Sequence, residues 1–227
     1  MGPSVSYHKH WMSFLSSHAI MGLILGTTCS PLLGLPFPNA PICGIILGVG
    51  LAYYRALLQP CDLSDWQIQL VSSIIHPFNS EHIEPDSYDL HLGSNFARIL
   101  PNGTKENWSG TSLTIQPNEC LLAHTLETFD FPPHIKGHLH GKSSWARLFL
   151  FVECAGLFDK GFRGTAVLEL YNASSTPLVV QAGAAIAQMS FHRTLPCCTP
   201  YGKAPRKSHY QNQKEAEPSC IAAKPLP

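Results

Sequence analysis

The residues best suited to catalysis lie between Gly141 and Asn172, in the segment GKSSWARLFLFVECAGLFDKGFRGTAVLELYN. This segment sets two adjacent serines, an arginine, an aspartate and a glutamate among long apolar runs. Charged residues make up only 13% of the chain, so their concentration in an apolar segment is informative. A buried carboxylate is costly unless it is paired or used in a reaction. Glu169, in the strand-like run AVLEL, therefore has the setting of a carboxylate adapted to proton transfer.

The alternative for Glu169 is a solvated position on an edge strand. In an extended strand, side chains two residues apart share a face, so Glu169 lies on the same face as Val167. An apolar neighbour on that face favours a catalytic role for the glutamate over a solvated one.

Ser143, Ser144 and Arg147 follow a predicted strand and form a second candidate group. Small hydroxyls and free backbone amides at such a turn can hold phosphate oxygens. An arginine suits a planar partner such as a carboxylate or a nucleotide group. The structural alternative is that a serine simply caps the first turn of a short helix.

Several motifs in order resemble the dCTP deaminase branch of the dUTPase-like superfamily, from about residue 62 to residue 213. These motifs are PDSYDLHLG, ETFDFPPHIKGHLHGKSS, GKSSWAR, AGLFDKGFRG, VLELYN, GAAIAQMSF and HYQNQ. The resemblance implies a mainly β fold, a distorted jelly-roll or β-barrel of the dUTPase-like type with a short N-terminal helix. It also implies a homotrimer with its sites between subunits.

The activity implied by this resemblance is zinc-independent hydrolytic deamination of dCTP to dUTP and ammonia, which supplies dUTP for dTTP synthesis. Glu169 would activate the water, while Ser143 and Arg147 would orient the water and the base. Mg²⁺ would be carried by the substrate triphosphate, and dTTP is an expected inhibitor. Nucleotide-binding roles are implied for Lys142, Ser144, Asp159, Val167, Gln188, Tyr201, His209, Tyr210 and Gln213.

Three departures from the family pattern affect these expectations. Lys142 replaces a more common arginine, so the charge is kept but bidentate phosphate contact is lost. His209 stands where lysine is usual, which predicts weaker or pH-dependent binding. The segment 149–159 is shorter than in the deaminases, which leaves dUTPase activity, alone or as a second activity, open as an alternative.

A third interpretation is a non-catalytic, membrane-tethered nucleotide-binding protein. The absence of a Gly-rich closing motif in the tail favours a deaminase over a dUTPase. Formation of a product separates both enzymes from the non-catalytic alternative.

Zinc-dependent deaminases carry H-x-E followed by P-C-x-x-C. The tripeptide His82-Ile83-Glu84 and the run Pro196-Cys197-Cys198 imitate these motifs, but residue 200 is proline and the gap is too long. His138 and His140 share a strand face without an evident third ligand. The sequence therefore predicts no zinc and no protein-bound metal.

Composition limits the remaining function classes. The 227 residues carry no formal net charge, so no basic field attracts nucleic acid. The eight cysteines are scattered without a C-x-x-C pair, and we interpret them as free thiols in a cytoplasmic protein.

The chain divides by composition into a hydrophobic extension (1–59), a deaminase-like domain (60–200) and a polar tail (201–227). Two apolar stretches in residues 19–58 are each close to the lower limit for crossing a bilayer. A membrane hairpin on the cytoplasmic side and a packed extension both remain open. The tail has no core pattern and is expected to close over the nucleotide.

The domain is predicted to begin with a helix that Asp62 or Ser64 caps and that runs to about Ile75, with Leu63, Trp66, Leu70, Val71 and Ile74 on its apolar face. Short alternating runs predict strands at 87–92, 96–100, 113–115, 120–124, 135–139, 149–152, 165–171, 178–180 and 185–191.

Overall fold

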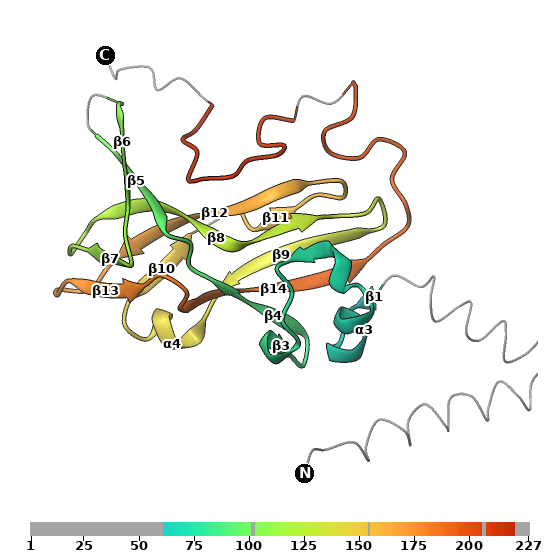
Figure 1. The fold of residues 1–227 in the computed structure, drawn as a ribbon, viewed down its shortest axis with the longest axis horizontal. Coiled ribbons are helices and arrows are strands. Elements are labelled where there is room, and N and C mark those ends of the chain that lie inside the picture. The colour runs from blue at the N-terminus through green and yellow to red at the C-terminus, as the bar shows by residue number, and fades with distance from the viewer. Residues whose placement is uncertain (1–60, 101–102, 154, 206–207, 221–227) are drawn as a thin grey trace, which may run out of the picture. The chain divides into compact units, whose positions relative to one another are not determined.

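A computed structural model describes residues 61–100, 103–153, 155–205 and 208–220. The predicted extension at 1–59, with its candidate membrane hairpin, lies outside the described residues. Within the described part of the chain, no helix has the length and hydropathy needed to cross a bilayer. The described residues form a mainly β structure with few helices, as the sequence predicts (Figure 1).

The strands form two six-stranded sheets and a two-stranded ribbon. The first sheet has the order β11-β9-β14-β4-β3, and β1 pairs with β14. Its strands are β1 (Cys61–Asp62), β3 (Ile83–Glu84), β4 (Ser87–His91), β9 (Ile135–Gly141), β11 (Leu157–Phe158) and β14 (Ala185–Arg193).

The second sheet has the order β10-β12-β8-β5-β6, and β2 pairs with β8. Its strands are β2 (Ile75–His76), β5 (Asn95–Ile99), β6 (Lys105–Ser109), β8 (Cys120–Asp130), β10 (Leu150–Glu153) and β12 (Arg163–Asn172). The ribbon joins β7 (Ser112–Ile115) to β13 (Leu178–Gln181). Both sheets keep open edges, so the arrangement is a distorted jelly roll and not a closed barrel.

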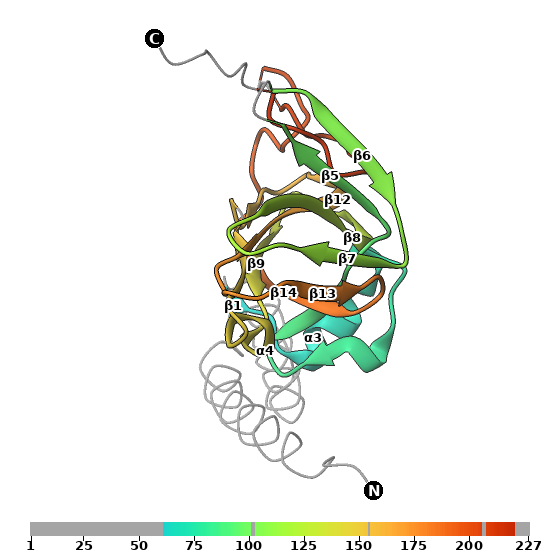
Figure 2. The same cartoon turned by 90° about the vertical axis from the view of Figure 1, so that its left-hand side faces the viewer.

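The two sheets face each other (Figure 2). The core lies between them and is made of apolar side chains that are buried at alternate positions along strands of both sheets. In β4, Tyr88 and Leu90 are buried while their neighbours are half-buried. Aromatic rings from both sheets meet, with the Phe131 centroid 5.7 Å from Phe129 and 5.9 Å from Phe191. Alternation of this kind is what made the strands visible in the sequence.

All nine predicted strands exist, with ends that differ by a few residues except in β8. That strand was expected to end at His124 and instead continues to Asp130. Its second half breaks the apolar alternation because Thr125 and Glu127 are polar residues that are buried and hydrogen-bonded. Strand β6 was missed because KENWS is an edge strand with one partly buried apolar side chain, Trp108.

The prediction for the first helix was wrong in length and only partly right in its buried face, since Leu63 and Ile74 are buried. The helix α3 covers only Asp65–Leu70, and a 3₁₀ turn η2 (Ser72–Ile74) leads into β2. Ile75 pairs with Phe129 of β8, so the chain must become extended there. Trp66 and Leu70 are exposed, by 38% and 70%, while Ile68 is fully buried. Ser64 is the N-cap, and its N–H donates to the Gln67 side chain.

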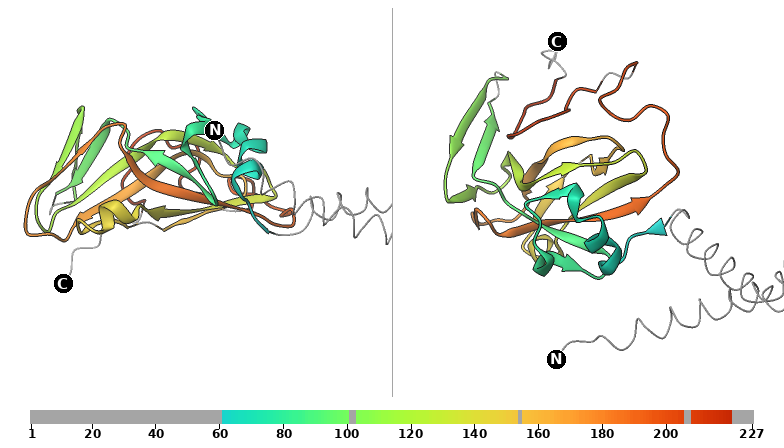
Figure 3. Two further views of the ribbon diagram at one scale, coloured as in Figure 1. Left: turned by 90° about the horizontal axis from the view of Figure 1, so that it is seen from below. Right: turned by 45° about the vertical axis from the view of Figure 1, so that its right-hand side comes forward.

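The remaining helical elements are η3 (Ser80–His82) and α4 (Ser143–Ala146). The tail after β14 runs past β11 and β12 (Figures 1 and 3). The sequence offered no core pattern for this tail, but Gln213 and Ala216 are buried, by 94% and 98% of their surface.

Candidate active site

A cavity of about 560 Å³ lies between β12, the turn after β11 and the tail. Its lining is mainly apolar, with a few polar groups, a composition typical of small-molecule sites. Six residues predicted for the site line this cavity: Asp159, Val167, Glu169, Tyr201, Tyr210 and Gln213. Residues far apart in sequence therefore meet around one space.

Glu169 reaches the cavity because of the alternation along β12. Leu168 and Leu170 are fully buried in the core, while Val167 and Glu169 share the opposite, half-buried face. Both residues line the cavity. The sequence pattern predicted that they share one face of the strand. The strand is held on both sides, since Glu169 is opposite Leu122 of β8 and Glu153 of β10. A carboxylate on a central strand of this kind is well fixed for proton transfer.

Asp159 follows β11 in a tight turn. The Phe162 N–H donates to the Asp159 carbonyl oxygen over 3.0 Å, and the Phe158 and Phe162 rings meet edge to face at 5.1 Å. These contacts fix the backbone while the Asp159 side chain stays exposed at the cavity. The residue can therefore bind a ligand hydroxyl or a water.

The tail closes one side of the cavity through hydrogen bonds to the domain. The Tyr201 N–H donates to the Lys160 carbonyl at 2.8 Å, and the Tyr201 hydroxyl accepts from the Tyr210 N–H at 3.0 Å. Gln213 Nε2 donates to the Thr165 carbonyl at 2.7 Å. His209 is exposed, its ring lies 6.2 Å from that of Tyr210 with the planes tilted by 59°, and it is not among the lining residues.

The other predicted residues gather at a different place, on α4 and the strands beside it. Ser143, Ser144 and Arg147 are exposed, and none of them lines the cavity. Lys142, the N-cap of α4, forms an ion pair with Asp89 of β4. Gln188 of β14 is directly opposite Asp89. One chain thus presents two separate groups, one around Glu169 and one around α4.

The sequence did not predict several residues of the cavity wall. Ile99 and Leu122 contribute apolar surface from β5 and β8, and Glu217, Pro218 and Ser219 contribute from the tail. The sequence carries no signal for Ile99, whose 46% exposure is seen only in the fold. The tail residues carry no recognisable pattern.

The two segments that imitate the zinc-deaminase motif do not come together as a metal site in the described residues. Glu84 is exposed on β3, and Cys197 lies in the loop after β14 with its N–H bonded to Pro133. His82 instead lies beside His91 and Glu127. The five cysteines that the structure describes in full are free thiols.

His138 and His140 share a face of β9, as predicted, with ring centroids 6.4 Å apart. His192 of β14 adds a ring 4.9 Å from His138 and contacts Asp62. Burial lowers the pKa of His138, and electrostatic effects of the neighbouring His192, Lys136 and His140 lower it further against the opposing effect of Asp62.

Comparison with known proteins gives a consistent result. A family model described as dCTP deaminase-like matches residues 63–194. A protein of Methanoculleus marisnigri named "dCTP deaminase, dUMP-forming" is 36% identical over 172 residues, which cover 68% of this chain and 91% of the relative. A protein of the same name from Corynebacterium glutamicum is 35% identical over 162 residues, 64% of this chain and 86% of the relative.

Among solved structures, the 2'-deoxycytidine 5'-triphosphate deaminase of Agrobacterium tumefaciens resembles this chain with a TM-score of 0.52 at 19% identity. The match covers 59% of this chain and 47% of the solved one, so this chain spans about half of that protein. This likeness supports the fold alone.

Proposed function

The chain belongs to the dCTP deaminase-like family, and on that premise we propose that it deaminates dCTP by hydrolysis at C4 of the cytosine ring. The observation that carries the proposal is the position of Glu169. It lies on a central strand, facing a largely apolar cavity that also contains Asp159 and the tail.

In the proposed reaction, Glu169 takes a proton from water as the oxygen attacks C4. The same carboxyl then delivers that proton to the ring nitrogen N3. It next takes the second proton from the hydroxyl group now bonded to C4 and passes it to the amino group, which leaves as ammonia as the C4 carbonyl forms. The sum is dCTP and water giving dUTP and ammonia. One carboxylate can perform both transfers because an apolar surrounding strengthens its interaction with the reacting atoms.

We propose further that the final product is dUMP. The relatives from M. marisnigri and C. glutamicum are named as dUMP-forming, and the short segment 149–159 agrees with a cavity that also hydrolyses dUTP. The second step consumes another water and releases pyrophosphate. Asp159, exposed at the cavity, is suited to hold either the sugar 3'-hydroxyl or the attacking water.

The separation of the two groups on one chain supports a site shared between subunits. Ser143, Ser144 and Arg147 are exposed, Lys142 beside them is half-buried, and none of the four lines the cavity of its own chain. In a homotrimer, we propose that this group meets the Glu169 cavity of a neighbouring copy. Ser143 and Arg147 would then orient water and base there, and Lys142 and Ser144 would contact phosphates.

Mg²⁺ enters this scheme with the substrate. The cavity lining offers the carboxylates of Asp159, Glu169 and Glu217, but in the described residues they do not form a three-ligand cluster. Binding through phosphate oxygens and waters fits this donor set better than a dedicated protein cage. The bound ion would neutralise part of the triphosphate charge, and dTTP would compete for the same nucleotide groups.

Chromatography of dCTP incubated with the full-length protein and Mg²⁺ tests the proposal. Appearance of dUMP, pyrophosphate and ammonia supports the complete reaction, and a parallel incubation with dUTP tests the second step alone. Accumulation of dUTP without dUMP would support deamination and reject the second step. Unchanged dCTP, with binding detected by calorimetry, would instead favour the non-catalytic alternative.

A further inference from the structure

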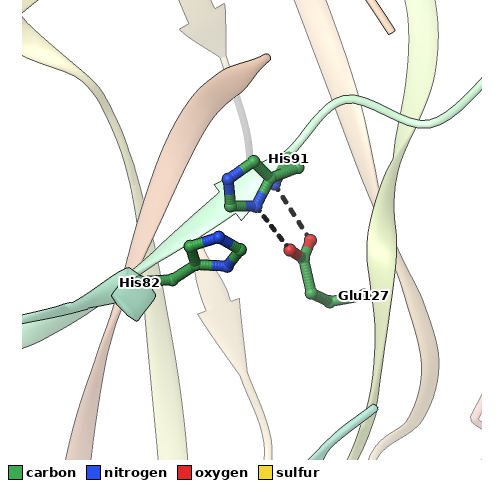
Figure 4. Close-up of side chains that lie close together, drawn as sticks. All are labelled: His82, His91 and Glu127. Carbon is green, nitrogen blue, oxygen red and sulfur yellow. Dashed lines mark hydrogen bonds and ion pairs between the residues drawn. The ribbon is translucent and has the colours of Figure 1, made fainter. Parts of the chain in front are cut away.

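Three side chains with metal-binding atoms meet away from the cavity, where η3, β4 and β8 approach one another (Figure 4). His82 ends η3, His91 ends β4, and Glu127 lies in the second half of β8. One donor atom from each residue lies within 4.8 Å of the other two. None of the three lines the candidate active site.

Glu127 is the most rigidly held side chain of this cluster. It is 99% buried, and His91 holds both of its carboxylate oxygens. His91 Nδ1 lies 2.7 Å from Oε1, and the His91 N–H donates to Oε2 over 3.0 Å. A carboxylate held at both oxygens has a defined orientation, which is what a metal ligand requires.

His82 completes the cluster from the other side. Its ring centroid lies 4.0 Å from that of His91, with the planes tilted by 40°. Asn79 Nδ2 lies 3.2 Å from Nε2, and the hydroxyl of the buried Tyr88 lies 3.5 Å from Nδ1. The ring is therefore positioned by neighbours on both of its nitrogens.

Two imidazoles and one carboxylate form a donor set that suits zinc and other first-row transition metals. Zinc binds nitrogen and oxygen at about 2.0–2.2 Å, so a tetrahedral ion needs donors roughly 3.3 Å apart. The spacing in the cluster, from 2.7 Å up to at most 4.8 Å, brackets this value. To bind the ion, the His82 ring would give up its contact to Asn79 or to Tyr88. The ion would replace the hydrogen between His91 Nδ1 and Glu127, and water would take the fourth position.

We propose that His82, His91 and Glu127 bind a divalent transition-metal ion, with Zn²⁺ as the best fit, and that this ion braces the two sheets. His91 belongs to the first sheet and Glu127 to the second, so the ion would add a link between strands that already meet at the Leu92–Thr125 bridge. This site is structural and is independent of the proposed deamination. It differs from the catalytic zinc that the sequence argues against, because neither Glu84 nor a cysteine takes part.

The test uses the full-length protein, freed of metal with a chelator and titrated with Zn²⁺ alone. We expect one equivalent to bind per chain and to raise the thermal unfolding midpoint, since binding to the folded state alone stabilises it. His82→Ala, at a partly exposed position, should lose most of this shift. His134→Ala removes an exposed histidine outside the cluster and should keep all of it.

Cobalt as a probe separates this cluster from the thiols. Co²⁺ bound by nitrogen and oxygen gives visible absorption without the intense near-ultraviolet sulfur bands that cysteine ligands produce. Three results would each overturn the proposal. The first is the appearance of sulfur bands, and the second is equal metal binding by His82→Ala and the parent protein. The third is an unchanged thermal unfolding midpoint on addition of Zn²⁺. Glu127→Gln is a second variant, and where it does not fold, the His82→Ala comparison decides.

Discussion

Gly164 of β12 and Gln213 of the tail form a parallel β-bridge five residues before Glu169. The two chains are in such close contact that a Cβ at Gly164 would lie 2.6 Å from the Gln213 carbonyl oxygen. The Thr165 N–H donates to that same oxygen over 3.0 Å. The tail is therefore attached directly to the strand that carries the candidate catalytic residue.

Gly164→Ala should detach the tail and lower kcat/KM for dCTP at least about tenfold, equivalent to about 1.4 kcal/mol. The added methyl group meets backbone, which cannot rotate away, and the φ of 131° also disfavours a side chain. Gly183→Ala is the matched control, because Gly183 also has a positive φ but a Cβ there meets nothing within 4 Å. Steady-state kinetics of both variants is the measurement. Equal losses in the two would show that backbone strain, and not tail docking, causes the effect.

Glu169→Gln should reduce deamination by about 100-fold to 10,000-fold, the range that proton transfer by a positioned group usually contributes. The amide keeps the shape of the side chain but cannot accept the proton of the attacking water. Glu217→Gln makes the same chemical change on the exposed tail segment of the same cavity and should keep most of the activity. Ammonia release from dCTP measures both variants. Comparable activity in both would remove Glu169 from the proposed mechanism.

The stability of the folded protein should fall as the pH decreases below about 6.5, in part because of His138. Burial and the neighbouring His192, Lys136 and His140 lower the pKa of His138, so the unfolded chain takes up the proton more readily than the folded one. The stabilisation from His138 is fully present when the pH is above the pKa of this histidine in the unfolded chain. It is lost as the pH falls through the lower pKa of His138 in the folded protein.

His138→Gln should accordingly flatten the slope of the unfolding free energy against pH between about pH 5 and 7. His134→Gln, which changes an exposed histidine in a loop, should leave the slope as it is. Urea unfolding at several pH values provides the free energies. An unchanged slope in His138→Gln would mean that other groups carry the pH dependence.

The sequence predicted the strands well wherever one face of a strand is apolar. In β12 the alternation of Leu168 and Leu170 with Val167 and Glu169 was sufficient to place the glutamate on the face opposite the core. The same rule failed where polar groups are buried in pairs. Glu127 is as buried as a leucine, but its partner His91 is 36 residues away, and no local pattern reveals such a pair.

Docking of the tail and division of the site were equally hidden from local patterns. Gln213 can be buried because its side-chain Nε2 donates to the Thr165 carbonyl oxygen and its own carbonyl oxygen accepts from the Thr165 N–H. These contacts depend on the complete fold. The resemblance implied a site between subunits, with Ser143 and Arg147 beside Glu169. On a single chain, the structure separates Glu169 from the exposed α4 residues Ser143, Ser144 and Arg147, which do not line the cavity.

Mixing two inactive variants tests whether the site is shared between subunits. Glu169→Gln and Arg147→Ala should each be inactive alone, since each lacks one of the two groups. Trimers formed from an equal mixture after dissociation and reassembly should recover about a quarter of the parent activity, because a site is complete where an intact Glu169 faces an intact Arg147 of the next copy.

The control mixture combines Arg147→Ala with Ser143→Ala, which damage the same group. No site in such a mixture contains an intact α4 group, so no recovery should follow. Assays of dCTP deamination before and after mixing, with trimer formation checked by light scattering, provide the measurement. Failure of the first mixture to recover, although mixed trimers form, would mean that Glu169 and Arg147 act within one chain and that the tail and α4 must rearrange to bring them together.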